Sequence, residues 1–350
     1  MADRLGRLRS RGCRAAGPGR ARARGRLRAR GQRARAGARA PAPGPGRGGV
    51  GLDARVSGVI HLVDASLYVC RAWFAQGPDV LDADGAPVHA VHGFTRFLLE
   101  LIERARPTHL AVAFDEALGS SFRHALYPAY KANRPPAPAD LVRQFAACKA
   151  IARALGARVL VDQRYEADDL IGSALAVARG HGYRGVIVSA DKDFGQLIGD
   201  HDEQWDPPRN ARWDSAGIRQ RLGVQPHQVA DYLALTGDAV DNIPGVAGIG
   251  ARTAAVLLAH FGSLEALLAR ADEVAFLRLR GAAGVARRLR EQAAAARLSR
   301  TLTAIATDAP VPAAIEAYGR GTPDPAIGAL LDRHAFGPLT RARVRALVPA

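Results

Sequence analysis

The 350-residue sequence has few cysteines and no long apolar run, and both shortages exclude classes of protein. Its three cysteines, Cys13, Cys70 and Cys148, are far apart and odd in number, so they form neither a disulfide framework nor a zinc-binding pattern. This usage fits a reducing cytoplasm. No apolar stretch approaches the roughly 18 residues that a transmembrane helix needs, so a membrane-spanning protein is excluded and no membrane partner is expected.

Lysine is also scarce, because only three of the 49 basic residues are Lys and the other 46 are Arg. The formal net charge of +16 alone indicates a polyanionic partner such as nucleic acid. Most of that excess belongs to residues 1–55, which hold 16 Arg, no Lys and two Asp, for a net charge of +14. The remaining 295 residues contain 33 basic and 31 acidic groups, so a basic DNA-binding face there requires segregated charges.

The first 50 residues contain almost no large apolar side chains and consist mainly of Arg, Gly, Ala and Pro. Such a segment cannot bury enough surface to offset its ordering entropy, so we predict that it is disordered. Three interpretations stay open: a nucleic-acid-binding arm, a transit peptide without the usual Ser content and amphipathic period, or translated upstream sequence. The third is favoured, with the true start near Val50, Val56 or Val59, because GC-rich DNA encodes these four residue types in any frame.

Beyond this tail, apolar strands alternate with helical patterns. Buried strands are predicted at 58–64, 108–115, 158–161 and 185–191. Helices are predicted at 66–75, 91–105, 139–155, after Tyr165, at 215–235 and through much of 255–350. Continuous apolar strands that alternate with helices predict an α/β fold with a mostly parallel sheet covered by helices.

Acidic residues stand at the ends of these elements. Asp64, Asp115 and Asp191 follow three of the strands, and ligands of parallel sheets bind outside the carboxyl ends of strands. Acids that begin a helix, such as those after Tyr165, are ordinarily explained by capping and the helix dipole. The candidate metal-binding acids are Asp64, Asp115, Glu166, Asp168, Asp169, Asp191, Asp193, Asp238 and Asp241. Crowded carboxylates repel one another unless cations relieve them, and all-oxygen ligands favour Mg²⁺ or Mn²⁺ over zinc.

Two further segments suit nucleic acid. Residues 116–139 interleave basic and aromatic side chains before three prolines, which fits either a nucleic-acid contact or a solvated loop. Gly245, Gly248 and Gly250 form a Gly-rich turn that opens a helix, and such a turn presents free backbone N–H groups to a phosphate. This pattern is typical of a helix-hairpin-helix element, with a plain helix–turn–helix corner as the alternative.

Seven motifs occur in a fixed order along the chain. They are Leu62-Val-Asp64-Ala-Ser, Phe114-Asp115, Ser121-Phe-Arg123, Tyr127-Pro-Ala-Tyr130-Lys131-Ala-Asn-Arg134, Tyr165-Glu-Ala-Asp-Asp169, Ser189-Ala-Asp191-Lys-Asp193, and Thr236-Gly-Asp238-Ala-Val-Asp241-Asn-Ile-Pro-Gly-Val-Ala-Gly-Ile-Gly250. Over residues 58–307 the chain resembles the 5′ nuclease (flap endonuclease and 5′–3′ exonuclease) family, meaning the 5′–3′ exonuclease domain of bacterial DNA polymerase I and free-standing relatives of the exonuclease IX type.

The resemblance implies a PIN-like α/β core with a helical arch and a C-terminal helix–three-turn–helix, or helix-hairpin-helix, domain. The corresponding division of the chain is a tail at 1–55, a catalytic domain at 56–214 with the arch at 116–139, a DNA-binding domain at 215–310 and a helical extension at 311–350. Since nothing after residue 307 suggests a polymerase domain, we expect none in this chain.

The resemblance also implies residue roles. Metal site one would use Asp64, Asp115, Glu166 and Asp168, with Asp169 close by or bridging, and site two would use Asp191, Asp193, Asp238 and Asp241. Catalytic roles would belong to Lys131, Arg123 and Asp168. DNA contacts would come from Arg123, Tyr130, Lys131, Arg134, Gly245, Gly248, Gly250, Arg252 and Thr253. Tyr130 would either stack on a base or pack within the arch, and the hairpin would bind K⁺ through backbone carbonyls.

Two departures from the family pattern stand out. Arg252 occupies a hairpin position that often holds Lys, and Arg binds phosphate as a planar fork rather than as a point charge. Residues 65–70 lack the Gly and His of polymerase-linked members, which places the chain among free-standing members and leaves its duplex-end contacts undefined.

These residues together predict a cytoplasmic, nucleoid-associated bacterial enzyme, monomeric by default. It would use two Mg²⁺ ions, with Mn²⁺ as a substitute, to cut DNA at 5′ ends or flaps in replication or repair, and RNA–DNA primers are further expected partners. One alternative is a DNA-junction or flap-binding protein with weak or no turnover. Another is a PIN-type ribonuclease, which the Gly-rich hairpin disfavours.

Overall fold

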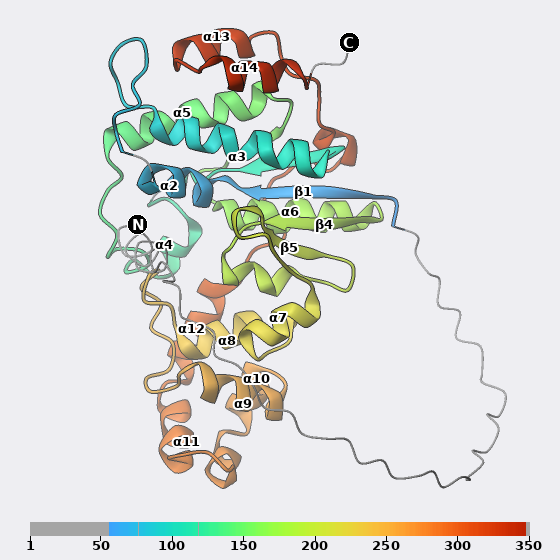
Figure 1. Cartoon of the computed structure of the whole chain (residues 1–350). Coiled ribbons are helices and arrows are strands. Elements are labelled where there is room, and N and C mark those ends of the chain that lie inside the picture. Colours follow the sequence, from blue (N-terminus) through green and yellow to red (C-terminus); the bar gives the residue numbers. More distant parts are fainter. Residues whose placement is uncertain (1–55, 76, 118, 348–350) are drawn as a thin grey trace, which may run out of the picture.

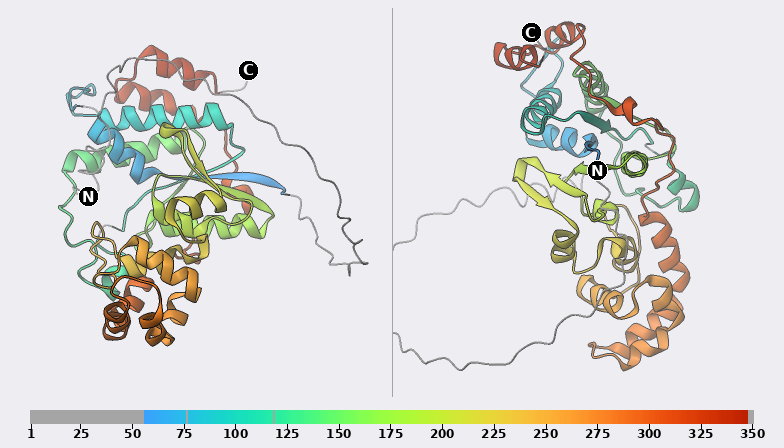
Figure 2. Two further views of the ribbon diagram at one scale, coloured as in Figure 1. Left: turned by 60° about the horizontal axis from the view of Figure 1, so that its bottom comes forward. Right: turned by 90° about the vertical axis from the view of Figure 1, so that its right-hand side faces the viewer.

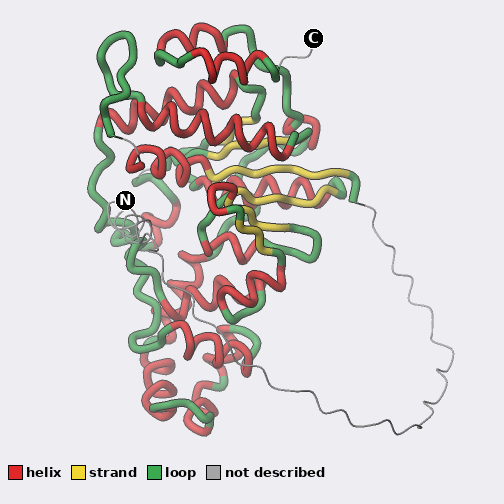
Figure 3. The backbone as a smooth tube through the Cα atoms, in the orientation of Figure 1, coloured by secondary structure: helices red, strands yellow, loops and turns green. Residues whose placement is uncertain are grey.

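The computed structural model describes residues 56–75, 77–117 and 119–347, and the predictions for residues 1–55 lie outside this part of the chain. Six strands form one sheet in the order β3-β2-β1-β4-β5-β6, with all neighbours parallel except the antiparallel pair β5 and β6. The strands are β1 Gly58–Asp64, β2 His109–Ala113, β3 Arg158–Leu160, β4 Tyr183–Val188, β5 Glu203–Asp206 and β6 Ala211–Trp213. The sheet occupies the middle of the molecule (Figure 3).

Helices cover both faces of the sheet (Figure 1). Alternate residues of β1 face opposite sides, since Ile60 and Leu62 belong to one buried cluster and Val63 to the other. The first cluster includes α6 (Ala167–Gly180), and the second includes α2 (Ala65–Ala75), α3 (His89–Ala105) and α5 (Ala139–Ala154). The predicted α/β fold, a mostly parallel sheet flanked by helices, is therefore confirmed.

A second group of helices extends the first buried cluster, the one that includes α6. These helices are α7 Ser215–Leu222, α8 Val229–Thr236, α9 Ala251–Phe261, α10 Leu264–Ala269, α11 Ala282–Glu291 and α12 Ala293–Thr303. Short 3-10 turns lie between or beside them, namely η1 Lys192–Leu197, η2 Pro207–Arg209, η3 Pro226–Gln228 and η4 Ala271–Phe276. The two views in Figure 2 place α9–α12 at one end of the molecule and the C-terminal helices at the opposite end.

After α12 the chain returns along the sheet. Arg320 N–H donates to Thr108 O at 2.8 Å and Gly321 N–H donates to Gly156 O at 2.9 Å, which anchors the returning segment beside β2 and β3. This segment includes η5 (Ile315–Tyr318) and leads to α13 (Ile327–Arg333) and α14 (Pro338–Arg345), which lie over α3 and α5 (Figure 1).

Some predicted elements differ from the structure. The strands β5 and β6 were not predicted, because both are short and contain polar residues such as Glu203 and Arg212. The single helix predicted over 215–235 is wrong, since Gly223, in the left-handed region at φ 78°, ends α7, and Pro226 starts η3 before α8. The domain boundaries stay predictions. In the described part of the chain, no helix has both the length and the hydropathy of a bilayer span.

Candidate active site

A cavity of about 830 Å³ opens at the carboxyl ends of the parallel strands. Seven of the nine acids predicted from the sequence line this carboxylate pocket: Asp64, Asp115, Glu166, Asp168, Asp191, Asp238 and Asp241. Lys131, Arg134 and Lys192 also line it. The topology therefore gathers side chains that are up to 177 positions apart in the sequence, as expected when parallel strands end at one edge.

The strand-end aspartates also cap the elements that follow them or lie beside them. Asp64 Oδ1 accepts a hydrogen bond from Leu67 N–H at 3.2 Å, at the start of α2. Asp115 Oδ1 accepts from Ala167 N–H at 2.8 Å, at the first residue of α6. These bonds satisfy N–H groups that a helix start leaves unpaired, and they hold each carboxylate in one direction at the edge of the pocket.

Cationic side chains pair with the acids of the pocket. Lys131 Nζ lies 2.7 Å from Glu166 Oε1, and Arg134 pairs with Asp241. Lys192 Nζ lies 2.8 Å from both Asp193 Oδ1 and Asp238 Oδ2. Asp193 does not line the pocket, but Lys192 forms ion pairs with both Asp193 and Asp238 and so links the two acids.

Ion pairing shifts the pKa values of Glu166 and Lys192. Burial alone would raise the pKa of Glu166, but Lys131 and Arg123 hold that pKa below its ordinary value. Burial alone would lower the pKa of Lys192, but Asp193 and Asp238 raise it. Glu166 and Lys192 are therefore both held in their charged forms.

The segment that contains Lys131 is pinned to the loop that contains Asp241. Lys131 N–H donates to Asp241 O at 2.9 Å, and the side-chain amide of Asn242 donates to Ala129 O at 2.6 Å. Lys131 has a φ of 54° and Asn242 a φ of 57°, and residues other than Gly rarely adopt these backbone angles. Within the described part of 116–139 only α4 (Phe122–Leu126) and the first residue of α5 are helical, so the predicted arch consists mostly of turns and loops, from which Lys131 and Arg134 reach the pocket.

Tyr130 packs rather than stacks. Its ring is buried with Ile243 and Leu302, and its hydroxyl donates to Glu166 Oε2 at 3.0 Å. Burial, then Glu166 and Asp241, raises the pKa of Tyr130, so the hydroxyl stays a donor. Of the two predicted roles, packing within the segment is the one that fits this position.

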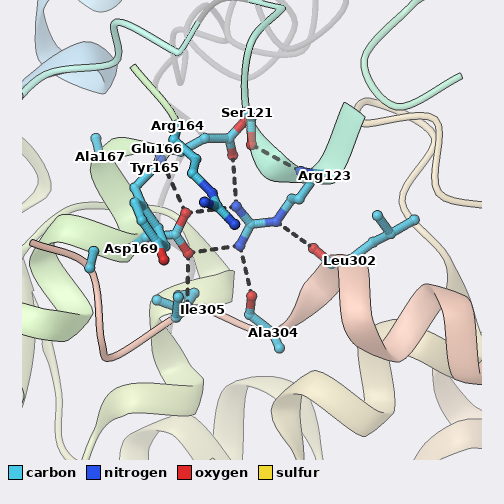
Figure 4. Close-up of polar contacts among 12 residues, drawn as sticks. Ser121, Arg123, Arg164, Tyr165, Glu166, Ala167, Asp169, Leu302, Ala304 and Ile305 are labelled. Carbon is cyan, nitrogen blue, oxygen red and sulfur yellow. Dashed lines mark hydrogen bonds and ion pairs between the residues drawn. The ribbon is translucent and has the colours of Figure 1, made fainter. Parts of the chain in front are cut away.

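Arg123 is placed differently from the prediction that it steers a phosphate. Its side chain is only 4% exposed, and its Nη1 and Nη2 donate to the two oxygens of Asp169 at 2.7 and 2.8 Å (Figure 4). Its remaining donors reach the carbonyls of Leu302 at 2.9 Å and Ala304 at 2.7 Å. Its guanidinium donates to protein groups and Arg123 does not line the pocket, so its catalytic and DNA-binding roles stay predictions that this arrangement does not favour.

Asp169 is likewise placed away from the pocket. It is fully buried, and besides Arg123 it accepts from Glu166 N–H at 3.1 Å and Ala306 N–H at 2.8 Å. Four hydrogen bonds from protein satisfy this carboxylate, so its place near or between the metals stays a prediction that this arrangement does not favour. Asp169 instead fixes the start of α6, beside Glu166 and Asp168, and joins it to the segment after α12.

The donor set of the pocket fits a hard divalent cation, since its acids are all carboxylates and no His lines it. Among the described residues, no three His, Cys, Asp or Glu side chains are grouped closely enough to hold a metal ion. The metal ligands therefore stay predictions.

The glycine turn presents fewer backbone donors than predicted. Gly245 N–H donates to Ser299 Oγ at 3.2 Å, and Ala247 N–H donates to Gln292 Oε1 at 2.8 Å. Gly248, Gly250 and Arg252 are exposed, and Gly250 is the N-cap of α9. A phosphate would therefore meet the part of the turn from Gly248 onward, not the whole turn.

Gly245 is required by the close approach of two backbone segments. Its φ is 65°, and a Cβ there would lie 2.4 Å from Gly237 N. We expect Gly245→Ala to lower the free energy of unfolding by at least about 1 kcal/mol, because both the backbone angle and the contact oppose the methyl group. Urea unfolding measures this. The matched control is Gly250→Ala, whose Cβ would meet nothing within 4 Å, and an equal loss in both variants would contradict the explanation.

Several residues of the site were missed from the sequence. Lys192, between Asp191 and Asp193, was noted only as a rare lysine, although its position between two acids was a usable signal. Asp206 ends β5 and pairs with Arg71, and it was missed because β5 itself was not predicted. Arg209 and Arg221 also line the pocket. Nothing in the sequence distinguished them, because isolated arginines are common in this Arg-rich chain.

Comparison with protein families finds two adjoining matches. Residues 59–223 match the 5′–3′ exonuclease N-terminal resolvase-like domain, and residues 224–326 match the 5′–3′ exonuclease C-terminal SAM fold. DNA polymerase I of Rhizobium leguminosarum is 38% identical over 259 residues, which are 72% of this chain but 25% of that protein. The 5′–3′ exonuclease of Aquifex aeolicus is 36% identical over 209 residues, which are 60% of this chain and 72% of that protein. The chain thus spans about a quarter of the polymerase relatives' length.

Solved structures share the fold at low sequence identity. T5 5′-exonuclease with bound zinc ions superposes with a TM-score of 0.59 at 16% identity, covering 83% of this chain and 98% of that one. The catalytic core of Rad2 in complex with DNA substrate superposes with a TM-score of 0.57 at 15% identity, covering 83% of this chain and 92% of that one. At this level of identity, both comparisons show a shared fold, that is, a similar arrangement of helices and strands.

Proposed function

This chain belongs to the 5′–3′ exonuclease family, and on that premise we propose that it is a Mg²⁺-dependent, structure-selective nuclease that hydrolyses DNA at 5′ ends or 5′ flaps. The observation that supports this proposal is the carboxylate pocket, where seven acids from separate elements meet at the carboxyl edge of a parallel sheet. RNA–DNA primers are proposed as a further substrate, and replication or repair in the bacterial cytoplasm as the setting.

The pocket acids would hold the divalent ions. Asp64, Asp115, Glu166 and Asp168 are proposed for one ion, and Asp191, Asp238 and Asp241 for the second, with Asp193 acting beside them through Lys192. Mg²⁺ is proposed because oxygen donors suit it, and Mn²⁺ would substitute. When bound, such a pair of ions supplies a nucleophile at neutral pH and stabilises the leaving oxygen.

The chain's own cations would position the DNA. Lys131 and Arg134 lie across the pocket at the acids, where an incoming phosphate would replace a carboxylate as their partner. Lys131 is then suited to stabilise the charge that develops on the phosphate. On the second helical group, exposed Arg252 and the neighbouring Thr253 at the start of α9 are proposed to hold a duplex phosphate, with K⁺ bound by carbonyls of the turn.

A DNA-junction or flap-binding protein with little turnover is the second candidate. Two observations favour it. Lysine or arginine pairs with Glu166, Asp193, Asp238 and Asp241. In the described chain, no three acids are grouped for a metal. The two candidates differ in turnover and agree on the DNA, and a monomer is proposed for both.

Polarity and structure selectivity test the proposed function. A duplex labelled at the 3′ end of its flapped strand is incubated with the full chain and Mg²⁺, beside a 3′-flap duplex and a blunt duplex. The proposal expects shortening from the 5′ side and preference for the 5′ flap. Equal cleavage of all three duplexes, or attack from the 3′ side, would overturn it, while tight binding without products would support the junction-binding alternative.

A further inference from the structure

One wall of the carboxylate pocket is basic, and its residues belong to none of the seven sequence motifs that resemble the 5′ nuclease family. Arg71, Arg209 and Arg221 line the same cavity as the acids. They come from α2, η2 and α7, and more than a hundred residues separate α2 from η2 in the sequence. We name these three side chains the arginine wall.

Asp206 organises the arginine wall. It ends β5, the neighbour of β4, and is fully buried at the edge where Asp64 and Asp191 also lie. Arg71 Nη1 lies 2.8 Å from Asp206 Oδ1, and Arg209 Nη1 lies 3.2 Å from Asp206 Oδ2. A buried carboxylate requires a cationic partner, but it requires only one. The second guanidinium is in excess.

Arg221 adds another positive charge beside this pair. Its Nη2 donates to Ala190 O at 3.0 Å, directly before the acid Asp191, and its guanidinium lies 4.3 Å from the centre of the Trp213 ring. Burial lowers the pKa of Arg221, and Arg209 lowers it further against the attraction of Asp206. Packing on Trp213 and the bond to a carbonyl hold the head group in place although burial opposes its charge.

Asp206 pairs with Arg71 and Arg209, and Arg221 lies near both Asp206 and Asp193, so the arginine wall places three guanidinium groups beside the metal-site acids. Arg209 is 54% exposed and its head group can turn toward a ligand, whereas Arg71 is 17% exposed and is held by Asp206. Planar guanidinium forks match the oxygens of a phosphate and bind it by two parallel hydrogen bonds. The chemistry on this wall therefore suits a phosphate group that lies next to the reacting one.

We propose that Arg209 and Arg221, supported by Arg71 and Asp206, form a phosphate-binding subsite that holds a phosphate of the DNA strand next to the one that is cut. The subsite rests on the proposed function for the identity of the strand. The phosphate has two possible sources, the 5′-terminal phosphate of the strand or an internal phosphodiester, and both present the oxygens that the forks recognise. A strand bound here would pass from Lys131 across Asp191 to α7.

Removal of the two charges tests the subsite. Arg209→Gln, Arg221→Gln and the double variant keep polar side chains of similar length, and unchanged melting curves verify the fold. Kd is measured by fluorescence anisotropy in EDTA, so that no cleavage occurs, for 5′-flap DNA with a 5′-phosphate or a 5′-hydroxyl at several salt concentrations. Each single variant is expected to bind about tenfold more weakly, the loss of one charge-assisted contact. The salt slope of the double variant should fall by about 2.

The matched control is Arg212→Gln, a nearby arginine on β6 that pairs with Glu203 and does not line the pocket. A loss of affinity confined to 5′-phosphorylated DNA assigns the subsite to the terminal phosphate, and an equal loss for both DNAs assigns it to an internal phosphodiester. If Arg209→Gln and the double variant match Arg212→Gln in Kd and slope, the subsite is disproved. A wild type that binds flap DNA in EDTA but does not cut it when Mg²⁺ or Mn²⁺ is added contradicts the proposed function. The comparison of Kd values remains decisive for the subsite in that case.

Discussion

Replacing Arg123 by Met is expected to lower the free energy of unfolding by about 3–5 kcal/mol, the cost of leaving a buried charge without its partner. Asp169 is fully buried, and Arg123 supplies two of its hydrogen bonds. The same guanidinium also binds the carbonyls of Leu302 and Ala304, so one side chain joins the segment after β2, the start of α6 and the end of α12. Met fills much of the volume and offers none of these bonds.

Urea unfolding of the full chain measures this prediction. Arg297→Ala is the control, because Arg297 forms an equally well-formed bidentate pair with Glu265 on the exposed surface, where such pairs contribute little. A double variant, Arg123→Met with Asp169→Asn, removes the unpaired charge and should regain part of the loss. A loss in Arg123→Met no greater than in Arg297→Ala would show that Asp169 is not dependent on Arg123.

Replacing Asp191 by Ala is expected to reduce the rate of flap cleavage on the order of 10³-fold, the scale of losing one electrostatic contributor to the transition state. Asp191 stands three residues after the end of β4 and lines the pocket, and its Oδ1 accepts from Asp193 N–H at 3.1 Å. Removing one acid from a crowded set lessens repulsion toward DNA, so binding should be retained or improved. Turnover and affinity should therefore separate.

Single-turnover cleavage and Kd in EDTA are measured on the same preparation. Asp200→Ala is the control, since Asp200 is an exposed acid in the connection between β4 and β5 and does not line the pocket. Asp191→Asn, which keeps the shape and one acceptor oxygen, should lose nearly as much turnover as Asp191→Ala. Unchanged turnover in Asp191→Ala would remove this residue from the proposed metal site.

The part of the site that follows from strand order could be predicted from the sequence. Asp64, Asp115 and Asp191 each come after an apolar strand, and parallel strands end at one edge, so their convergence required no knowledge of packing. Capping could be predicted in the same way. Asp64 and Asp115 both line the pocket and cap a helix, because the N–H groups of a helix start face the same edge of the sheet as the pocket.

The roles of Arg123 and Asp206 could not be predicted, because each depends on a partner distant in sequence. Arg123 stands in a basic and aromatic segment, where an arginine ordinarily faces solvent, and its burial depends on Asp169 and on carbonyls about 180 positions away. Asp206 ends a four-residue strand with Glu203 and Gln204 in it, so no hydrophobic pattern marked the strand. Long-range pairing, rather than local preference, decided both.

Metal dependence of cleavage tests the central claim most directly. The full-length wild type is mixed with a labelled 5′-flap duplex in EDTA, then Mg²⁺ is added in excess, and products are followed with time. The carboxylate pocket predicts binding without products in EDTA and prompt cleavage from the 5′ side once Mg²⁺ or Mn²⁺ is present. Cleavage at the same rate in EDTA, or bound flap DNA that is never cut with either ion, would contradict it.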